Sequence, residues 1–177
     1  MVFSKTSIDG VFIIEPEKRE DGRGYFARVF CREELKKAGI DMNAVQINTS
    51  YNLKKFTLRG LHFQEAPHSE IKIVRCVRGA IYDVAVDIRT GSPTFGRYVS
   101  AELTPENGRM LLVPKGFAHG YLTLRDESDV IYFVSDFYAP GAEKGYRYDD
   151  PLLDIDWPSK EQLIISEKDL NWGYCKF

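Results

Sequence analysis

Short runs of alternating residues dominate the chain from Ala44 onward, and they most constrain its fold. Residues 81–88, Ile-Tyr-Asp-Val-Ala-Val-Asp-Ile, combine β-branched and aromatic side chains with two acids, a pattern typical of a strand. Similar runs cover residues 10–14, 44–49, 71–77, 97–103, 109–113, 121–124 and 130–135. Glycine, proline and asparagine lie between them, as expected for turns. Many short strands at regular spacing predict a mainly β protein, an antiparallel sandwich or barrel.

Few segments have a helical pattern. Residues 32–38, Arg-Glu-Glu-Leu-Lys-Lys-Ala, predict a helix that ends at Gly39, because glycine commonly terminates helices. Residues 159–163 and 166–170 near the end of the chain are expected to form one or two short helical turns.

Length and charge narrow the class of protein. The 177 residues suit one domain, predicted to span residues 1–177, that buries roughly 70% of the surface of its unfolded chain. Lys and Arg number 24 against 26 Asp and Glu, so the basic patch of a nucleic-acid binder is not expected. No apolar run approaches the roughly 18 residues of a membrane span, and no secretory leader is recognisable. Cys31, Cys76 and Cys175 form no CxxC pair, which favours reduced thiols in a cytoplasmic protein.

Two of the three histidines lie in conspicuous contexts. His62 ends a β-like stretch, and His119 follows Gly108, Pro114 and Gly116 at a spacing that resembles the second motif of the cupin double-stranded β-helix. A single histidine taken alone is equally well interpreted as a hydrogen-bonded structural residue.

A catalytic metal is not expected at these histidines. Cupins that bind metal use a His-x-His pair, a glutamate and the later histidine, whereas here Gln64 follows His62 and Lys72 stands near the position of the acid. An amide and a cation are poor replacements for an imidazole and a carboxylate. His68, the one substitute ligand, is expected to lie exposed in a loop beside Pro67.

Several motifs in one order resemble the dTDP-4-dehydrorhamnose 3,5-epimerase family, from about Gly10 to Trp172. They are Asp21-Gly-Arg-Gly-Tyr-Phe26, Arg59-Gly-Leu-His-Phe-Gln64, Lys72, Arg78-Gly79, Tyr82-Asp-Val-Ala-Val-Asp87, Pro114-Lys-Gly-Phe-Ala-His-Gly120, Asp149-Asp-Pro151, Ile155-Asp-Trp-Pro158 and Ser166-Glu-Lys-Asp169. The resemblance implies a homodimeric cupin barrel, with a few short helices and no metal or other cofactor. It also implies a substrate that is a nucleotide-activated 4-keto-6-deoxy sugar.

The chemistry of such an epimerase needs three kinds of group. A base removes a hydrogen beside the ketone, a second group stabilises the enolate oxygen, and an acid returns a proton from the opposite face. By resemblance His62 is the base, Asp169 orients it and stabilises the imidazolium, and Lys72 holds the enolate. The family motif makes Tyr132 the acid, with Tyr138 as the alternative donor.

The resemblance also implies the residues that bind the substrate. A diphosphate requires cationic donors, and Arg59, beside the Gly-Leu-His turn, suits a bidentate grip on phosphate. Phe26 or Tyr138 is expected to stack on the base, and the family segment matching residues 23–26 comes from the partner subunit. The matching positions are Arg23, Gln46, Asn48, Arg59, Lys72, His119, Glu143 and Lys168.

Three features depart from the family pattern. Arg28 stands where a glutamate is usual, Phe133 replaces a basic residue, and the loop of residues 65–70 lacks the usual Gln-Gly-rich form. We expect Arg28 to face the nucleotide pocket and to shift base preference away from thymine, because it exchanges two acceptors for five donors.

Four other functions remain open from the sequence. A 3-only or 5-only epimerase and a 3,4-ketoisomerase would use the same fold and a similar base. A metal-binding cupin dioxygenase would need bound iron. A non-catalytic sugar-binding cupin would need neither the base nor the opposed acid.

Overall fold

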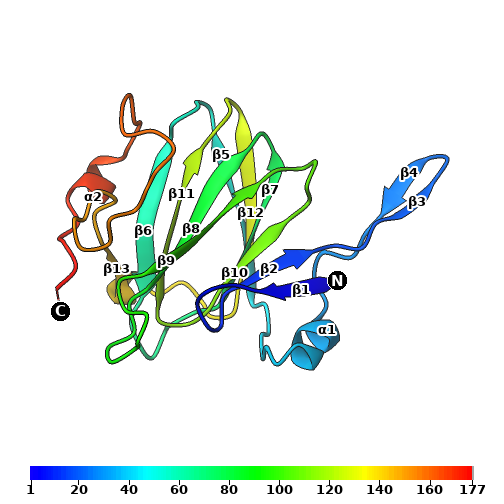
Figure 1. The fold of residues 1–177 in the computed structure, drawn as a ribbon, viewed down its shortest axis with the longest axis horizontal. Coiled ribbons are helices and arrows are strands. Elements are labelled where there is room, and N and C mark those ends of the chain that lie inside the picture. Colours follow the sequence, from blue (N-terminus) through cyan, green and yellow to red (C-terminus); the bar gives the residue numbers. More distant parts are fainter. Residues whose placement is uncertain (177) are drawn as a thin grey trace.

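The fold is a sandwich of two antiparallel sheets in a computed structural model that describes residues 1–176 (Figure 1). The six-stranded sheet has the order β1 (Val2–Lys5), β2 (Phe12–Glu15), β10 (Met110–Val113), β7 (Lys72–Arg78), β12 (Ser128–Val134) and β5 (Gln46–Asn52). The five-stranded sheet has the order β13 (Glu143–Gly145), β6 (Leu58–Gln64), β11 (Phe117–Thr123), β8 (Ile81–Asp87) and β9 (Tyr98–Leu103). The mainly β prediction is confirmed.

A separate hairpin of β3 (Arg19–Asp21) and β4 (Gly24–Phe26) projects from the body, on the right of Figure 1. The helices are α1 (Arg32–Lys37), the 3-10 turn η1 (Pro140–Ala142) and α2 (Glu167–Leu170). The predicted helix over residues 32–38 and the turn over 166–170 are therefore confirmed.

Each predicted strand is present, with its ends moved by a few residues at most. The largest shift concerns residues 121–124, which belong to a strand that begins earlier, at Phe117. Strands β1, β3, β4 and β13 were not predicted, because each has only three or four residues with at most two apolar side chains, whereas the equally short β2 and β10 lie in apolar runs.

The helical turn expected over residues 159–163 is wrong. This segment has no helix; the Ser159 hydroxyl donates to the Glu161 carbonyl, and Ile164 then forms an isolated bridge with Thr57. Tertiary pairing with the start of β6 therefore overrides local helical preference.

Apolar side chains form three clusters, one between the sheets and one on each outer face. Val74, Ile81, Leu111, Tyr121 and Val130 fill one part of the space between the sheets. The C-terminal segment, through Leu153, Ile155 and Trp157, covers the outer face of the five-stranded sheet, and α1 packs through Leu35 against the outer face of the other. The remaining space between the sheets is lined by polar side chains.

Among the described residues, no helix is long and apolar enough to cross a membrane. The domain prediction extends to Phe177, which lies outside the described residues.

Candidate active site

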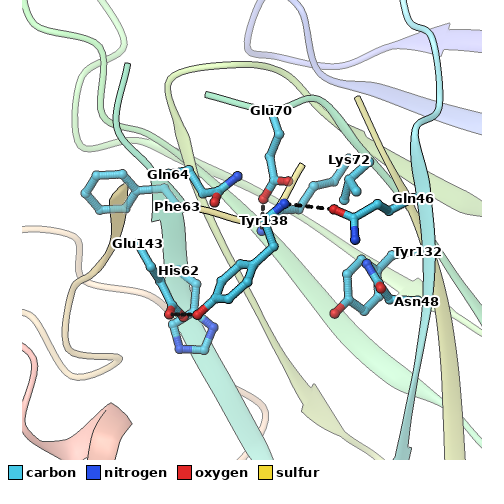
Figure 2. Close-up of a pocket in the computed structure, with 11 residues that line it drawn as sticks. Gln46, Asn48, His62, Phe63, Gln64, Glu70, Lys72, Tyr132, Tyr138 and Glu143 are labelled. Atoms are coloured by element: carbon cyan, nitrogen blue, oxygen red, sulfur yellow. Dashed lines mark hydrogen bonds and ion pairs between the residues drawn. The ribbon is translucent and has the colours of Figure 1, made fainter. Parts of the chain in front are cut away.

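The polar part of the interior contains two hollows of about 340 and 220 Å³. His62, Lys72 and Tyr132 line both hollows, which together form one candidate site; Figure 2 shows the larger hollow. The larger is also lined by Gln46, Asn48, Phe63, Gln64, Glu70, Val134, Tyr138 and Glu143. The smaller is also lined by Ser50, Arg59, His119 and Tyr121.

The alternation of strand side chains explains why these residues meet. Gln46, Asn48 and Ser50 occupy every second position of β5, so all three face the interior while Ile47 faces outward and is exposed. Register completes the arrangement: Tyr132 of β12 pairs with Asn48 of β5, and His62 of β6 pairs with His119 of β11.

His62 and Asp169 form a short polar contact in the site. Nε2 of His62 lies 2.6 Å from Oδ1 of Asp169, although the two residues are 107 positions apart. Asp169 is buried in α2; its Oδ2 accepts from the Gly60 N–H at 3.2 Å, and its own N–H donates to the Ser166 hydroxyl that caps the helix.

The environment of Asp169 fixes which ring nitrogen of His62 carries a hydrogen. Burial alone would raise the pKa of Asp169, but the hydrogen bonds from His62 and Gly60 lower it overall. An ionised Asp169 requires Nε2 of His62 to carry a hydrogen, so the neutral imidazole has its lone pair on Nδ1. His62 is thereby prepared to accept a proton.

Lys72 is largely buried and paired with a carboxylate that sequence analysis did not select. Its Nζ lies 3.1 Å from Oε1 of Glu70, and the two side chains are only 13% and 11% exposed. Glu70 was missed because it belongs to the loop of residues 65–70, where no strand pattern indicated that its side chain points inward.

Tyr132 of β12 lines the same cavity as this pair and lies on the strand next to β7, which carries Lys72. Burial raises the pKa of its phenol, the charges of Glu70 and Glu143 raise it further, and Arg59 acts in the opposite direction. The hydroxyl therefore keeps its proton at neutral pH.

Tyr138, Glu143 and Lys168 form a hydrogen-bonded chain at the mouth of the cavity. The Tyr138 hydroxyl donates to Oε2 of Glu143 at 2.7 Å, as Figure 2 shows, and Nζ of Lys168 lies 2.6 Å from Oε1. Burial opposes ionisation of Glu143, but Lys168 and Tyr138 lower its pKa overall. The N–H of Tyr138 donates to Gln46, which ties this chain to β5.

His119 has a buried acidic partner. Its Nε2 lies 2.7 Å from Oδ1 of Asp83, which is fully buried; burial raises the pKa of Asp83, and His119 opposes that shift. Oδ2 of Asp83 has no hydrogen-bond partner within residues 1–176. The sequence analysis did not identify Asp83 as the partner of His119. The available signal was the position of this acid inside a strongly apolar strand.

Arg59 reaches the smaller hollow from β6. Its Nε donates to Oδ1 of Asn52 at 2.7 Å, and Asn52 is itself buried and donates to the backbone of Ser50 and Ser128. A rigid amide thus orients the guanidinium. Asn52 was not singled out from the sequence, where it is one polar residue in a polar strand.

Arg23, Phe26 and Arg28 do not line the cavity of their own chain. Arg23 pairs with Asp21 and Phe26 is exposed, both on the projecting hairpin. Arg28 pairs with Glu34 of α1 at 3.0 Å, beside a separate hollow of about 100 Å³. The structure therefore places these three residues away from the cavity that the other predicted site residues line.

The residues of the site do not suit a metal. No group of three or more histidine, cysteine or acidic residues within residues 1–176 is arranged to hold one. His68, considered as a substitute ligand, lies in the exposed loop 3.7 Å from Asp136.

Comparison with known proteins gives consistent matches over nearly the whole chain. The family model described as dTDP-4-dehydrorhamnose 3,5-epimerase matches residues 5–176. A protein of that name from Sinorhizobium fredii is 47% identical over 169 residues, covering 96% of this chain and 87% of the relative.

Solved structures match equally well. A dTDP-4-dehydrorhamnose 3,5-epimerase from Bacillus anthracis, with TDP and PPi bound, has a TM-score of 0.95 at 37% identity and covers 98% of this chain and 99% of the other. A dTDP-6-deoxy-D-glucose-3,5-epimerase from Legionella pneumophila, in complex with dTDP-4-keto-L-rhamnose, has a TM-score of 0.93 at 42% identity, with 98% and 92% covered. These matches confirm the cupin fold expected from the sequence.

Proposed function

Because the chain belongs to the dTDP-4-dehydrorhamnose 3,5-epimerase family, we propose that it converts dTDP-4-dehydro-6-deoxy-D-glucose to dTDP-4-dehydro-L-rhamnose. The chain is an isomerase of the epimerase type and serves dTDP-rhamnose biosynthesis. The reaction inverts C3 and C5, the two carbons beside the C4 ketone. Each inversion removes a C–H hydrogen, leaves an enolate and returns a proton to the other face.

His62 is the proposed base. Nδ1 takes the proton while Nε2–H stays hydrogen-bonded to Asp169, whose negative charge stabilises the imidazolium that results. The carboxylate is buried and accepts from the Gly60 N–H, and the backbone of Asp169 is fixed by its N–H bond to the Ser166 hydroxyl, so the group needs no reorganisation during the reaction.

Lys72 is the proposed partner of the enolate oxygen. Its ammonium group lies in a cavity shielded from bulk water, where a preorganised donor stabilises developing negative charge far better than in solution. His119, in the same cavity, is proposed to donate a hydrogen bond to the sugar.

Tyr132 is the proposed acid. Its position in the same cavity as His62, but on the other sheet, is the main support for the proposed epimerase activity. His62 comes from the five-stranded sheet and Tyr132 from the six-stranded sheet, and both line the same cavity. A sugar ring between them would be deprotonated on one face and reprotonated on the other, which is what inversion requires. The raised pKa of Tyr132 keeps the proton available.

We propose that Arg59 binds the diphosphate, and that the polar groups of the larger hollow bind the remaining substrate. Arg59 offers a planar set of donors at the smaller hollow. The other binding residues are Gln46, Asn48, Tyr138, Glu143 and Lys168.

The active enzyme is proposed to be a homodimer that shares its sites. The hairpin of β3 and β4 packs little against its own chain: the Arg23 side chain is 90% exposed and Phe26 is 66% exposed. An extended hairpin of this kind suits insertion at the cavity of a second copy, where Arg23, Phe26 and Arg28 would meet the nucleotide.

We also propose that residues 1–177 act as one domain, since both sheets contribute to a single cavity. A cytoplasmic location is supported by the free state of Cys31, Cys76 and Cys175, because reduced thiols are usual in a reducing compartment.

Incubation with the proposed substrate in deuterated water tests this function. Inversion at both centres gives dTDP-4-dehydro-L-rhamnose carrying two deuterons at C3 and C5, whereas a monoepimerase gives inversion at one. His62→Ala should lower the incorporation rate by about 100-fold or more. Absence of incorporation by the wild-type protein would refute the proposal, and transfer of the keto group to C3 would instead identify a ketoisomerase.

A further inference from the structure

We propose that Glu70 is a positioning residue for this reaction, which holds the Lys72 ammonium against the cavity wall so that it meets the enolate oxygen. The inference rests on the proposed function, because it assigns a task to the loop residue that touches the proposed enolate partner. Nothing in the sequence pattern singled out Glu70.

The geometry of the pair supports this role. Oε1 of Glu70 lies 3.1 Å from Nζ of Lys72, and both side chains lie in the wall of the larger hollow, Glu70 above Lys72 in Figure 2. A lysine side chain has four rotatable bonds, so one fixed carboxylate contact removes much of its freedom. An ammonium group has three N–H donors; one bond to Glu70 leaves two for the substrate.

The loop that carries Glu70 is itself fixed from both sides. The buried Gln64 donates to the carbonyls of His68 and Phe137 and accepts from the N–H of Ala139. The next residue, Ile71, accepts from the Ser135 N–H and donates its own N–H to the Ser135 hydroxyl, just beyond the end of β12. Glu70 therefore lies in a loop that is fixed by hydrogen bonds on both sides. Such a loop can hold the carboxylate in one place, which the positioning of Lys72 requires.

A second effect follows from the negative charge of Glu70. It lies near Tyr132 and contributes to the raised pKa of that phenol, after burial. The titratable or charged groups around Tyr132 are Lys72 of β7, Arg59 and His62 of β6, His119 and Tyr121 of β11, Glu143 of β13, and Glu70 and Tyr138 of the loops. Glu70 raises the pKa of Tyr132 and Arg59 lowers it. When the Glu70 charge is removed, the pKa of the Tyr132 phenol falls, so the phenol loses its proton at lower pH.

Three variants test the proposal. Glu70→Ala removes the anchor, and we expect kcat to fall about tenfold with KM changed less than about twofold. Glu70→Gln keeps an oxygen for Lys72 but not the charge, so kcat should fall less while the alkaline limb of the kcat profile moves to lower pH. Glu65→Gln is the matched control, since Glu65 is an exposed acid of the same loop whose nearest cation, Lys144, is 3.9 Å away; it should leave kcat and the pH profile unchanged.

The outcomes separate this proposal from the proposed function. A wild-type protein that fails to exchange deuterium with the keto sugar overturns both. An active wild type with unchanged kcat in both Glu70 variants, or with KM raised alone, overturns only the role of Glu70. Thermal unfolding accompanies each measurement; if Glu70→Ala does not fold, the isosteric Glu70→Gln decides, and an unchanged kcat in that variant then overturns the proposal.

Discussion

At the residue scale, the site depends on side chains whose chemical state is set by one or two neighbours. Asp169 and Glu70 illustrate the point, since each is a carboxylate in close contact with one side chain of the cavity, His62 and Lys72 respectively. The consequence is that a conservative substitution, which changes a charge but little volume, should alter the chemistry more than the fold.

Asp169→Asn is the sharpest test at the base. The amide can still accept from Nε2–H of His62, but it carries no negative charge to stabilise the imidazolium. We expect solvent exchange at C3 and C5 to slow by about 100-fold or more, with dTDP affinity unchanged within about threefold. Mass spectrometry in deuterated water gives the rate and calorimetry the affinity. A wild-type exchange rate in this variant would remove Asp169 from the mechanism.

Tyr132→Phe separates the acid from the base. Without the hydroxyl, His62 can still remove a proton and exchange it with solvent on its own face, so deuterium should enter the starting sugar while inversion slows by about 100-fold. NMR of the recovered sugars distinguishes retained from inverted product. Tyr138→Phe is the control, because its hydroxyl already donates to Glu143. Normal inversion in Tyr132→Phe with loss in Tyr138→Phe would reverse the two assignments.

At the element scale, the site depends on close contact between β6 and β11. Gly60 has φ of +111°, and an ideal Cβ there would lie 2.7 Å from both the Gly120 Cα and the His119 carbonyl oxygen. Only glycine allows this approach, which brings His62 and His119 into register across the two strands.

Gly60→Ala should therefore cost about 3 kcal/mol or more in free energy of unfolding, from backbone strain plus a steric clash. Gly91→Ala is the matched control, since Gly91 has φ of +80° with nothing within 4 Å of its ideal Cβ. Its strain alone should cost about 1 kcal/mol. Urea unfolding measures both values; equal losses would show that the close approach of β6 and β11 does not limit stability.

At the scale of the whole molecule, one chain holds the cavity and a second is proposed to complete it. Arg23 and Phe26 lie on the hairpin that projects from the body in Figure 1, and neither lines the cavity of its own chain. If the sites are shared, a mixture of two impaired variants should be more active than either variant alone.

Chains carrying His62→Ala and chains carrying Arg23→Ala should each be weakly active alone. Coexpressed in equal amounts, random pairing makes half the dimers mixed, and each mixed dimer has one intact site. We expect about a quarter of wild-type activity if the hairpin serves the partner, from the symmetry of a two-fold dimer. A mixture no more active than the two variants would show that each hairpin serves its own chain. Light scattering gives the oligomeric state of each sample.

The sequence by itself determined the class of fold, because alternation of side chains along a strand and turn residues between strands are local properties. The strand at residues 81–88, the helix ended by Gly39 and the inward face of Gln46 and Asn48 all follow from such local rules. Resemblance of ordered motifs added the family and nominated His62, Lys72, Tyr132 and Asp169.

Only the tertiary structure decided which of these residues meet. His62 and Asp169 lie 107 positions apart and join because α2 packs beside β6, which no local pattern predicts. Glu70 and Asp83 became visible as partners of Lys72 and His119 once burial and distances were known. The helix expected over residues 159–163 failed for the same reason: non-local pairing and burial outweigh local preference wherever a segment can gain both.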